Sequence, residues 1–245
     1  MCLGVLVIPD GFFSRDSIID TTTAATFNMP VIDMAIVNQE TQAEAIATLP
    51  VPTETILPPS VYIYTPYYSQ APENNRKLPW SMLCSEANLV LAAYAVQDKA
   101  LNKQQFKEEM LAMIPIQEKA FGTYFSIPMH DLKGLYDTMY PTVGNTWILE
   151  NPSLKDMKSE LAKGNLIIAP TAGKLLHNRF FVNGWPTFHT ILIVWYDETH
   201  FYINEVGMSN GENFTYTHET VMYAMHDFVK GDITQWAKRV LVIEK

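Results

Sequence analysis

The chain has 245 residues, a hydrophobic content of 48% and a formal net charge of −9. Its length allows one domain, alone or with an extension, and its apolar content is ample for a core. The negative charge and the lack of any Lys/Arg cluster argue against a nucleic-acid surface. The two cysteines form at most one bridge, which excludes a disulfide-stapled scaffold, and no Cys/His cluster has zinc-ligand spacing, so we expect no metal or cofactor.

Residues 1–60 differ from the rest of the chain and are interpreted as an N-terminal extension or linker, with residues 61–245 as the main domain. The end of this extension is rich in proline, which is typical of a linker, with Pro50, Pro52, Pro58 and Pro59. Its longest apolar stretch, residues 3–9, is too short to span a bilayer and lacks a basic flank. We therefore expect no membrane span and no clear signal peptide, which leaves the cytoplasm, a bacterial envelope or secretion open as locations.

The first part of the main domain is predicted to be mostly helical. A strand at residues 61–64 leads into the loop that contains Gln70. Apolar residues at helical spacing then predict three helices, over residues 85–97, 101–113 and 129–139. The second of these is expected to stop before Pro115, because proline disrupts a helix interior.

A fourth helix and then a set of strands follow. Ser153 and Asp156 form a variant capping box that opens the helix, and Gly164 ends it. Extended patterns predict strands over residues 166–169, 190–195, 200–206 and 239–243, with a short helix over residues 220–228. Helices first and strands second are typical of an α+β fold, with the site expected where the two halves meet.

Cys84 lies at the start of the first predicted helix. Backbone N–H groups and the helix dipole stabilise a thiolate there and can donate to an oxyanion. A lone cysteine is more often a small buried hydrophobe, so catalysis depends on partners elsewhere. Gln70 is a candidate oxyanion donor, with a solvated loop glutamine as the alternative. Glu86 is explained by the preference for an acid in the first helical turn.

His189 precedes an apolar strand and is the candidate base, because its near-neutral pKa suits proton transfer. A hairpin brings the next strand back beside it, and that strand carries Asn204 and Glu205. These two point to opposite faces, so only one of them can contact the imidazole. An anionic Glu205 stabilises an imidazolium, whereas Asn204 only orients the ring. The residues alone leave this choice open.

In this order the residues resemble the bacteriocin-leader (double-glycine) peptidase-like branch of the papain-like cysteine peptidases, family thirty-nine in the usual classification. The resemblance covers about residues 61–230. Each piece is short, and the ordered set is more specific than any one of them. The matching segments are residues 66–72, 84–87, 164–170, 188–189, 196–197 and 203–207.

The resemblance implies a papain-like α+β fold, in which a helical half with the nucleophile helix packs on a C-terminal antiparallel sheet. It implies Cys84 as nucleophile and His189 as base. It also implies Gln70 as oxyanion donor and Glu205 as the acid, although Asp is usual there and Ser85 replaces a common Gly. We expect a cysteine-type peptidase acting on peptide or isopeptide bonds of a peptide or protein substrate. The alternative is a catalytically weak or inactive peptide-binding module on the same fold.

Overall fold

The computed structural model describes residues 56–181, 186–229 and 232–245 of the protein. Most of the predicted extension, residues 1–55, lies outside the described residues. The described residues belong to one compact unit, Glu54–Lys245. The described residues ahead of the first strand already contact this unit. The Tyr196 hydroxyl donates a 2.9 Å hydrogen bond to the carbonyl of Pro58.

An antiparallel sheet forms one half of this unit. Its described strands follow the order β2-β7-β3-β4-β5-β6, and β1 pairs with β4 off this path. The strands are β1 (Val61–Tyr62), β2 (Thr146–Glu150), β3 (Leu166–Thr171), β4 (His189–Tyr196), β5 (His200–Asn204), β6 (Phe214–Thr217) and β7 (Arg239–Ile243). The central strand β4 therefore has neighbours on both sides, as its continuous apolar run predicts.

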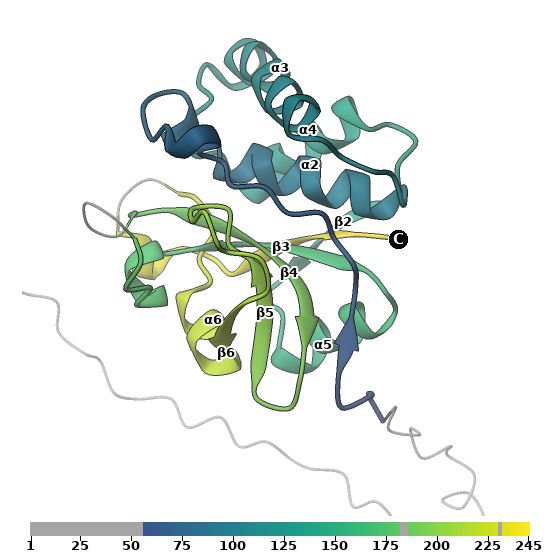
Figure 1. Ribbon diagram of the computed structural model, residues 1–245. Helices are drawn as coiled ribbons and strands as arrows, with labels where there is room; N and C mark the ends of the chain where they lie inside the picture. The colour runs from purple at the N-terminus through teal and green to yellow at the C-terminus, as the bar shows by residue number, and fades with distance from the viewer. Residues whose placement is uncertain (1–55, 182–185, 230–231) are drawn as a thin grey trace, which may run out of the picture. The chain divides into compact units, whose positions relative to one another are not determined.

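Helices cover both faces of the sheet (Figure 1). The described α-helices are α2 (Cys84–Val96), α3 (Lys103–Phe121), α4 (Met129–Met139), α5 (Leu154–Ala162) and α6 (His218–Ala224). The first three gather on one side of the sheet, whereas α5 and α6 lie on the other. This arrangement confirms the predicted α+β class, with an N-terminal helical half packed on a C-terminal antiparallel sheet.

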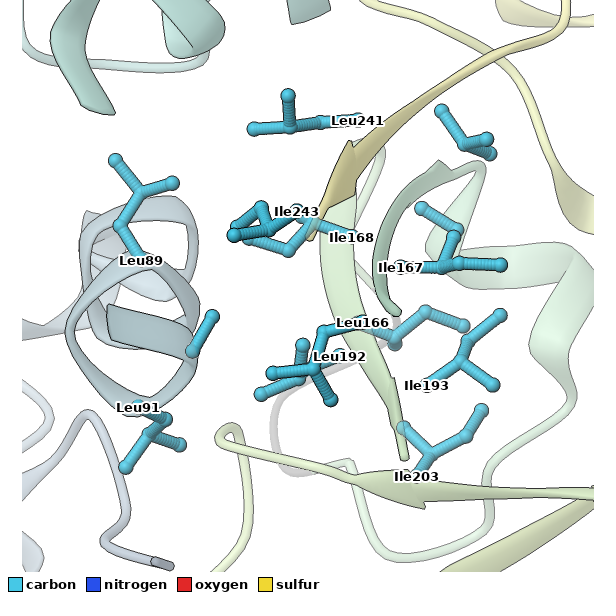
Figure 2. Close-up of a cluster of buried hydrophobic side chains, with 14 of the residues drawn as sticks. Leu89, Leu91, Leu166, Ile167, Ile168, Leu192, Ile193, Ile203, Leu241 and Ile243 are labelled. Carbon is cyan, nitrogen blue, oxygen red and sulfur yellow. The ribbon is translucent and has the colours of Figure 1, made fainter. Parts of the chain in front are cut away.

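Helix α2, which begins at Cys84, is the centre of the core. Of its 13 residues, 11 are buried, because it lies between the sheet and α3. Figure 2 shows Ile168 and Leu192 of the sheet on the side of α2, and Ile167 and Ile193 on the opposite side. The register pairs Ile168 with Leu192 and Ile167 with Ile193, so each pair shares one face. Burial on both faces fixes the position of β4 closely.

The predicted end of α3 before Pro115 is wrong, since the helix continues to Phe121. Pro115 is exposed, whereas Met113 and Gln117 are buried on the inner face. The carbonyl that loses its helical partner therefore lies on the solvent side, where water can satisfy it. Burial of the inner face offsets the lost hydrogen bond.

Some strand and helix boundaries also differ from the prediction. The short strands β2 and β6 are missed, because both are partly exposed and lack a long apolar run. Strand β5 ends at Asn204, and α6 begins at His218 instead of residue 220 and ends at Ala224 instead of residue 228. The side chain of Thr217 caps α6 by accepting a 3.1 Å hydrogen bond from the N–H of Thr220. The capping residue therefore sets the start of this helix.

Replacing Pro115 with Ala should raise the free energy of unfolding by about 1 to 3 kcal/mol, because alanine restores the helical hydrogen bond. Loss of the proline's constraint on the unfolded chain offsets part of this gain. Urea denaturation followed by circular dichroism measures the change. Lys119→Ala, at another exposed site of α3, is the control and should change stability by less than about 0.5 kcal/mol. A lower stability of Pro115→Ala would contradict the expectation.

Candidate active site

Cys84 is the first residue of α2 and follows a 3-10 turn at Trp80–Met82. It is a free thiol, 9% exposed, and lines a cavity of about 530 Å³. Burial raises the pKa of this thiol. A hydrogen bond with His189, the charge of His189 and hydrogen bonds with Thr190 together lower the pKa by more than burial raises it. The net result is a pKa below the ordinary value of a cysteine. The N–H groups of the first helical turn also lack partners within the helix and favour negative charge here.

His189 opens β4, where it pairs with Thr171 of β3. The Thr171 hydroxyl donates a 2.9 Å hydrogen bond to the His189 carbonyl, which fixes the backbone beneath the ring. The Phe181 ring packs edge-on against the imidazole at 5.3 Å between centroids. Because the imidazole is almost fully buried, these contacts leave it little freedom to rotate.

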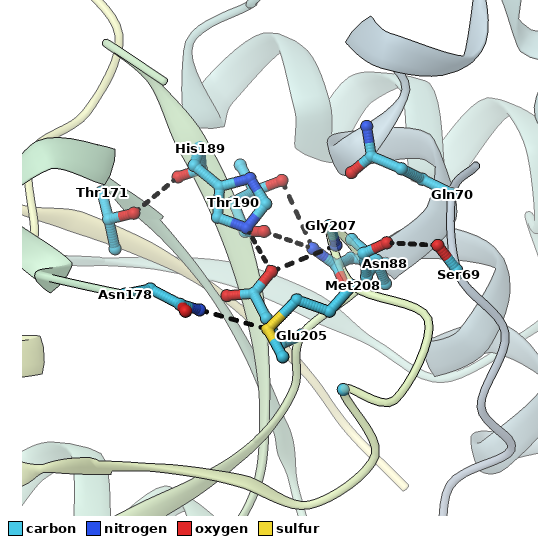
Figure 3. A network of polar contacts seen from close by, with 12 residues as sticks. Ser69, Gln70, Asn88, Thr171, Asn178, His189, Thr190, Glu205, Gly207 and Met208 are labelled. Carbon is cyan, nitrogen blue, oxygen red and sulfur yellow. Dashed lines mark hydrogen bonds and ion pairs between the residues drawn. The ribbon is translucent and has the colours of Figure 1, made fainter. Parts of the chain in front are cut away.

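Glu205 holds the other end of the imidazole (Figure 3). Its Oε1 lies 2.6 Å from His189 Nε2 and accepts a 3.1 Å hydrogen bond from the Gly207 N–H. Burial lowers the pKa of His189. The charge of Glu205 and hydrogen bonds with Cys84 and Glu205 together raise the pKa by more than burial lowers it. The net result is a pKa above the ordinary value, which favours an imidazolium next to the thiol.

Tyr216 of β6 completes the surroundings of the Glu205 carboxylate. Its hydroxyl donates a 3.0 Å hydrogen bond to Glu205 Oε2 and accepts one of 2.8 Å from Asn178 Nδ2. Burial, followed by the charge of Glu205, raises the pKa of Tyr216 well above its ordinary value. Tyr216 therefore stays protonated and remains a donor to the carboxylate.

Tyr67 anchors the loop that follows Glu205. Its hydroxyl donates to the carbonyls of Glu205 and Met208 and accepts a 2.9 Å hydrogen bond from the Gly211 N–H. A Cβ atom on Gly211 would lie 2.0 Å from the Glu205 carbonyl oxygen, so this close approach requires glycine. The loop conformation thereby fixes the backbone that carries the carboxylate.

Gln70 lies in the same cavity as Cys84 and is 7% exposed. Its Nε2 donates a 2.9 Å hydrogen bond to the Trp80 carbonyl, and its backbone N–H donates to the carbonyl of Val206 at 2.9 Å. One N–H of the side-chain amide therefore remains for a ligand. Within the described part of the chain, Gln70 Oε1 is buried without a hydrogen-bond partner.

Asn204 lies away from the imidazole, on the other face of the strand. Its Nδ2 donates a 3.1 Å hydrogen bond to the Pro66 carbonyl, and its Oδ1 accepts from the Asn213 N–H at 3.5 Å. Of the two residues that the sequence leaves open, Glu205 is thus the one beside His189. Asn204 instead ties the 66–72 segment to the sheet.

The polar cluster that adjoins Cys84 through Thr190 is not predicted from the sequence. Thr190 Oγ1 lies 3.3 Å from the Ser85 hydroxyl, and Asn88 Nδ2 donates a 2.9 Å hydrogen bond to the Thr190 carbonyl. All three residues are buried. The alternation of side chains along a strand is the signal that could have indicated this cluster, because Thr190 follows His189 and therefore faces the opposite side of β4.

Neither a metal-binding cluster nor a membrane-spanning helix is found among the described residues. Among the residues that the structure describes, no group of three or more His, Cys, Asp or Glu side chains is placed to hold a metal ion. Within the same residues, no helix combines the length and the apolar content that a membrane span requires.

No family model and no curated protein matches this chain. The fold is similar to the crystal structure of a protein from Bacillus anthracis described as a C39-like peptidase, with a TM-score of 0.51 and 12% identity over 76% of this chain and 98% of that one. Xylellain, a cysteine protease from Xylella fastidiosa, matches with a TM-score of 0.35 and 17% identity over 78% of this chain and 87% of its own. The first similarity confirms the predicted fold: this chain has the fold of a C39-like, papain-like peptidase.

Proposed function

We propose that the protein is a cysteine-type peptidase that hydrolyses peptide or isopeptide bonds of a peptide or protein substrate. The observation that carries the proposal is the buried chain of contacts from Cys84 through His189 to Glu205. A thiol pKa below its ordinary value and an imidazole pKa above its own favour a thiolate–imidazolium pair. The peptidase fold described above supports the same reaction class.

In the first step, the Cys84 thiolate attacks the carbonyl carbon of the scissile bond. Negative charge then develops on the carbonyl oxygen. The free N–H of the Gln70 amide and the backbone N–H of Cys84 are suited to donate to this oxyanion, since both border the same cavity. Stabilisation is strong here because the site is largely shielded from water.

His189 carries the proton through both halves of the reaction. As an imidazolium it protonates the leaving amine, which releases one product and leaves an acyl-enzyme on Cys84. The neutral imidazole then removes a proton from water, and the resulting hydroxide attacks the acyl carbon. The C–S bond breaks, which releases the carboxylic acid product and restores the thiolate–imidazolium pair. Glu205 stabilises each imidazolium state through its 2.6 Å contact with Nε2.

The two departures from the family's pattern are compatible with this chemistry. Glu205 reaches the imidazole even though it is one carbon longer than the usual Asp. The Ser85 hydroxyl points away from solvent and contacts Thr190 at 3.3 Å, so it is accommodated in the packing between α2 and β4. Neither residue blocks the thiol.

Alkylation of Cys84 by iodoacetamide tests the activated thiol, in a Cys2→Ser background that removes the other cysteine. Because the thiol pKa is lowered, thiolate persists to a lower pH than in an ordinary cysteine, and alkylation should be fast below the ordinary thiol pKa of about 8.5. His189→Ala should move the onset of alkylation to that value or above. His130→Ala, an exposed histidine of α4, is the control. Slow alkylation of the parent protein at neutral pH would instead favour the binding module.

Glu205→Gln should reduce kcat/KM by roughly 10²- to 10⁴-fold, because the imidazolium loses its buried counter-charge. The rate is measured by mass spectrometry on peptides cleaved from a proteome-derived library. Asn204→Ala alters the neighbouring residue on the opposite face and should retain most of the activity of its folded fraction. Equal losses in the two variants, with both folded by circular dichroism, would argue against the assigned role of Glu205.

Gln70→Ala should lower kcat by roughly 10²- to 10³-fold, since one oxyanion donor is lost. The rate of Cys84 alkylation should stay unchanged, because that reaction forms no oxyanion on the substrate. Gln104→Ala, an exposed glutamine of α3, serves as the control for both measurements. A parallel fall of alkylation and turnover in Gln70→Ala would show that Gln70 acts on the thiol instead.

A further inference from the structure

Glu86 stands two residues after Cys84, in the first turn of α2. An acid that merely favours a helix start is expected at the surface, yet Glu86 is 1% exposed. It borders the same cavity as Cys84 and His189. A buried acid in this position needs a partner, or it must lose its charge.

The partner of Glu86 is Gln117 of α3, which lies beside α2 (Figure 1). Gln117 Nε2 donates a 2.6 Å hydrogen bond to Glu86 Oε1. In the described part of the molecule, the two remaining oxygens of the pair, Glu86 Oε2 and Gln117 Oε1, are both buried without a hydrogen-bond partner. Both of these atoms are acceptors in the ionised pair, so the pair lacks a hydrogen-bond donor.

A proton on Glu86 supplies this donor. A carboxylic acid and a primary amide form a ring of two hydrogen bonds, in which the amide N–H donates to one carboxyl oxygen and the acid O–H donates to the amide oxygen. Both orphaned oxygens are then satisfied. Burial, as the largest cause, raises the pKa of Glu86 to about 8, and the charge of Cys84 adds to this, whereas hydrogen bonds from its own backbone and from Gln117 lower it.

The other groups around Glu86 are compatible with a neutral acid. The cation Arg76 also lines the cavity, but it is exposed, donates a 3.0 Å hydrogen bond to the Gly207 carbonyl and is not among the charges that act on Glu86. On its own helix, Cys84 is the charged group that acts on it. Helix α3 presents the uncharged Gln117, and the segment before α4 adds the uncharged Tyr124 and Ser126 to the cavity. His189 of β4 faces the thiol and pairs with it.

We propose that Glu86 is a protonated carboxylic acid paired with Gln117, and that this neutral pair is a positioning element of the active site. The pair joins the nucleophile turn of α2 to α3. It also keeps a second negative charge out of the cavity in which the Cys84 thiolate and the oxyanion must form. The second role rests on the proposed peptidase function, whereas the protonation of Glu86 does not.

Infrared spectroscopy of the full-length protein tests the protonation directly. The carbonyl stretch of a protonated carboxylic acid should be present at neutral pH, disappear as the pH rises through about 8, and be absent in Glu86→Gln. In Gln117→Leu the band should persist at neutral pH but shift in frequency, because the acid loses its hydrogen-bonded partner. The difference between wild type and Glu86→Gln separates this band from that of buried Asp227, whose pKa burial also raises. No difference band at neutral pH would overturn the proposal.

The charge in the cavity is probed by alkylating Cys84 with anionic iodoacetate and with neutral iodoacetamide, again in the Cys2→Ser background. As Glu86 ionises, the ratio of the iodoacetate rate to the iodoacetamide rate should fall on the order of threefold or more in the wild type. In Glu86→Gln the ratio should stay flat across the same pH range. Glu118→Gln, an exposed acid of α3, is the control and should behave as the wild type. The same fall in Glu86→Gln as in the wild type would overturn the positioning role.

The two readouts separate failure of this proposal from failure of the proposed function. If Cys84 reacts slowly with both reagents at every pH, the peptidase assignment fails, while the infrared band still decides the state of Glu86. If Cys84 is reactive and the ratio of the iodoacetate rate to the iodoacetamide rate is the same in the wild type and in Glu86→Gln, the peptidase assignment stands and the positioning role is wrong.

Discussion

A carboxylate without solvent exposure imposes the strongest physical constraint on this molecule. Removing the charge of Glu205 from water costs several kcal/mol unless compensating partners surround it. The partners are the His189 imidazole, the Gly207 N–H and the Tyr216 hydroxyl. They come from three different segments of the chain, which must all reach their native positions before the charge is satisfied. The site and the sheet therefore depend on one another.

The segment around Gln70 is part of the same constraint. Tyr67 holds the carbonyls of Glu205 and Met208, and the Ser69 hydroxyl donates a 3.0 Å hydrogen bond to the Val206 carbonyl. The segment that contains Gln70 is thus hydrogen-bonded to Glu205 and the loop that follows it. These hydrogen bonds connect the two sides, so a shift of one side would break contacts with the other.

Local patterns predicted much of the fold from the sequence. Helix α4 and strand β7 match their predicted bounds, since a clear apolar period and a continuous apolar run define them. The hairpin of β4 and β5 brings Glu205 beside His189, as predicted. Alternation alone shows that Asn204 and Glu205 face opposite ways, but not which face meets the imidazole. That choice depends on the β-bulge between Ile193 and Trp195 and on the loop after β5, which are tertiary features.

The extension of α3 past Pro115 has a consequence for how the length of the chain can vary. Each residue turns an α-helix by about 100°, so one residue inserted between Asn102, which caps α3, and Gln117 would rotate the amide to a different face. Glu86 would then meet another side chain. Beyond Gln117, the helix ends at Phe121 and Gly122 caps it, and an insertion there leaves the inner face in register. The stretch before the amide is therefore as fixed in length as the spacing within α2, whereas the stretch after it is free to change.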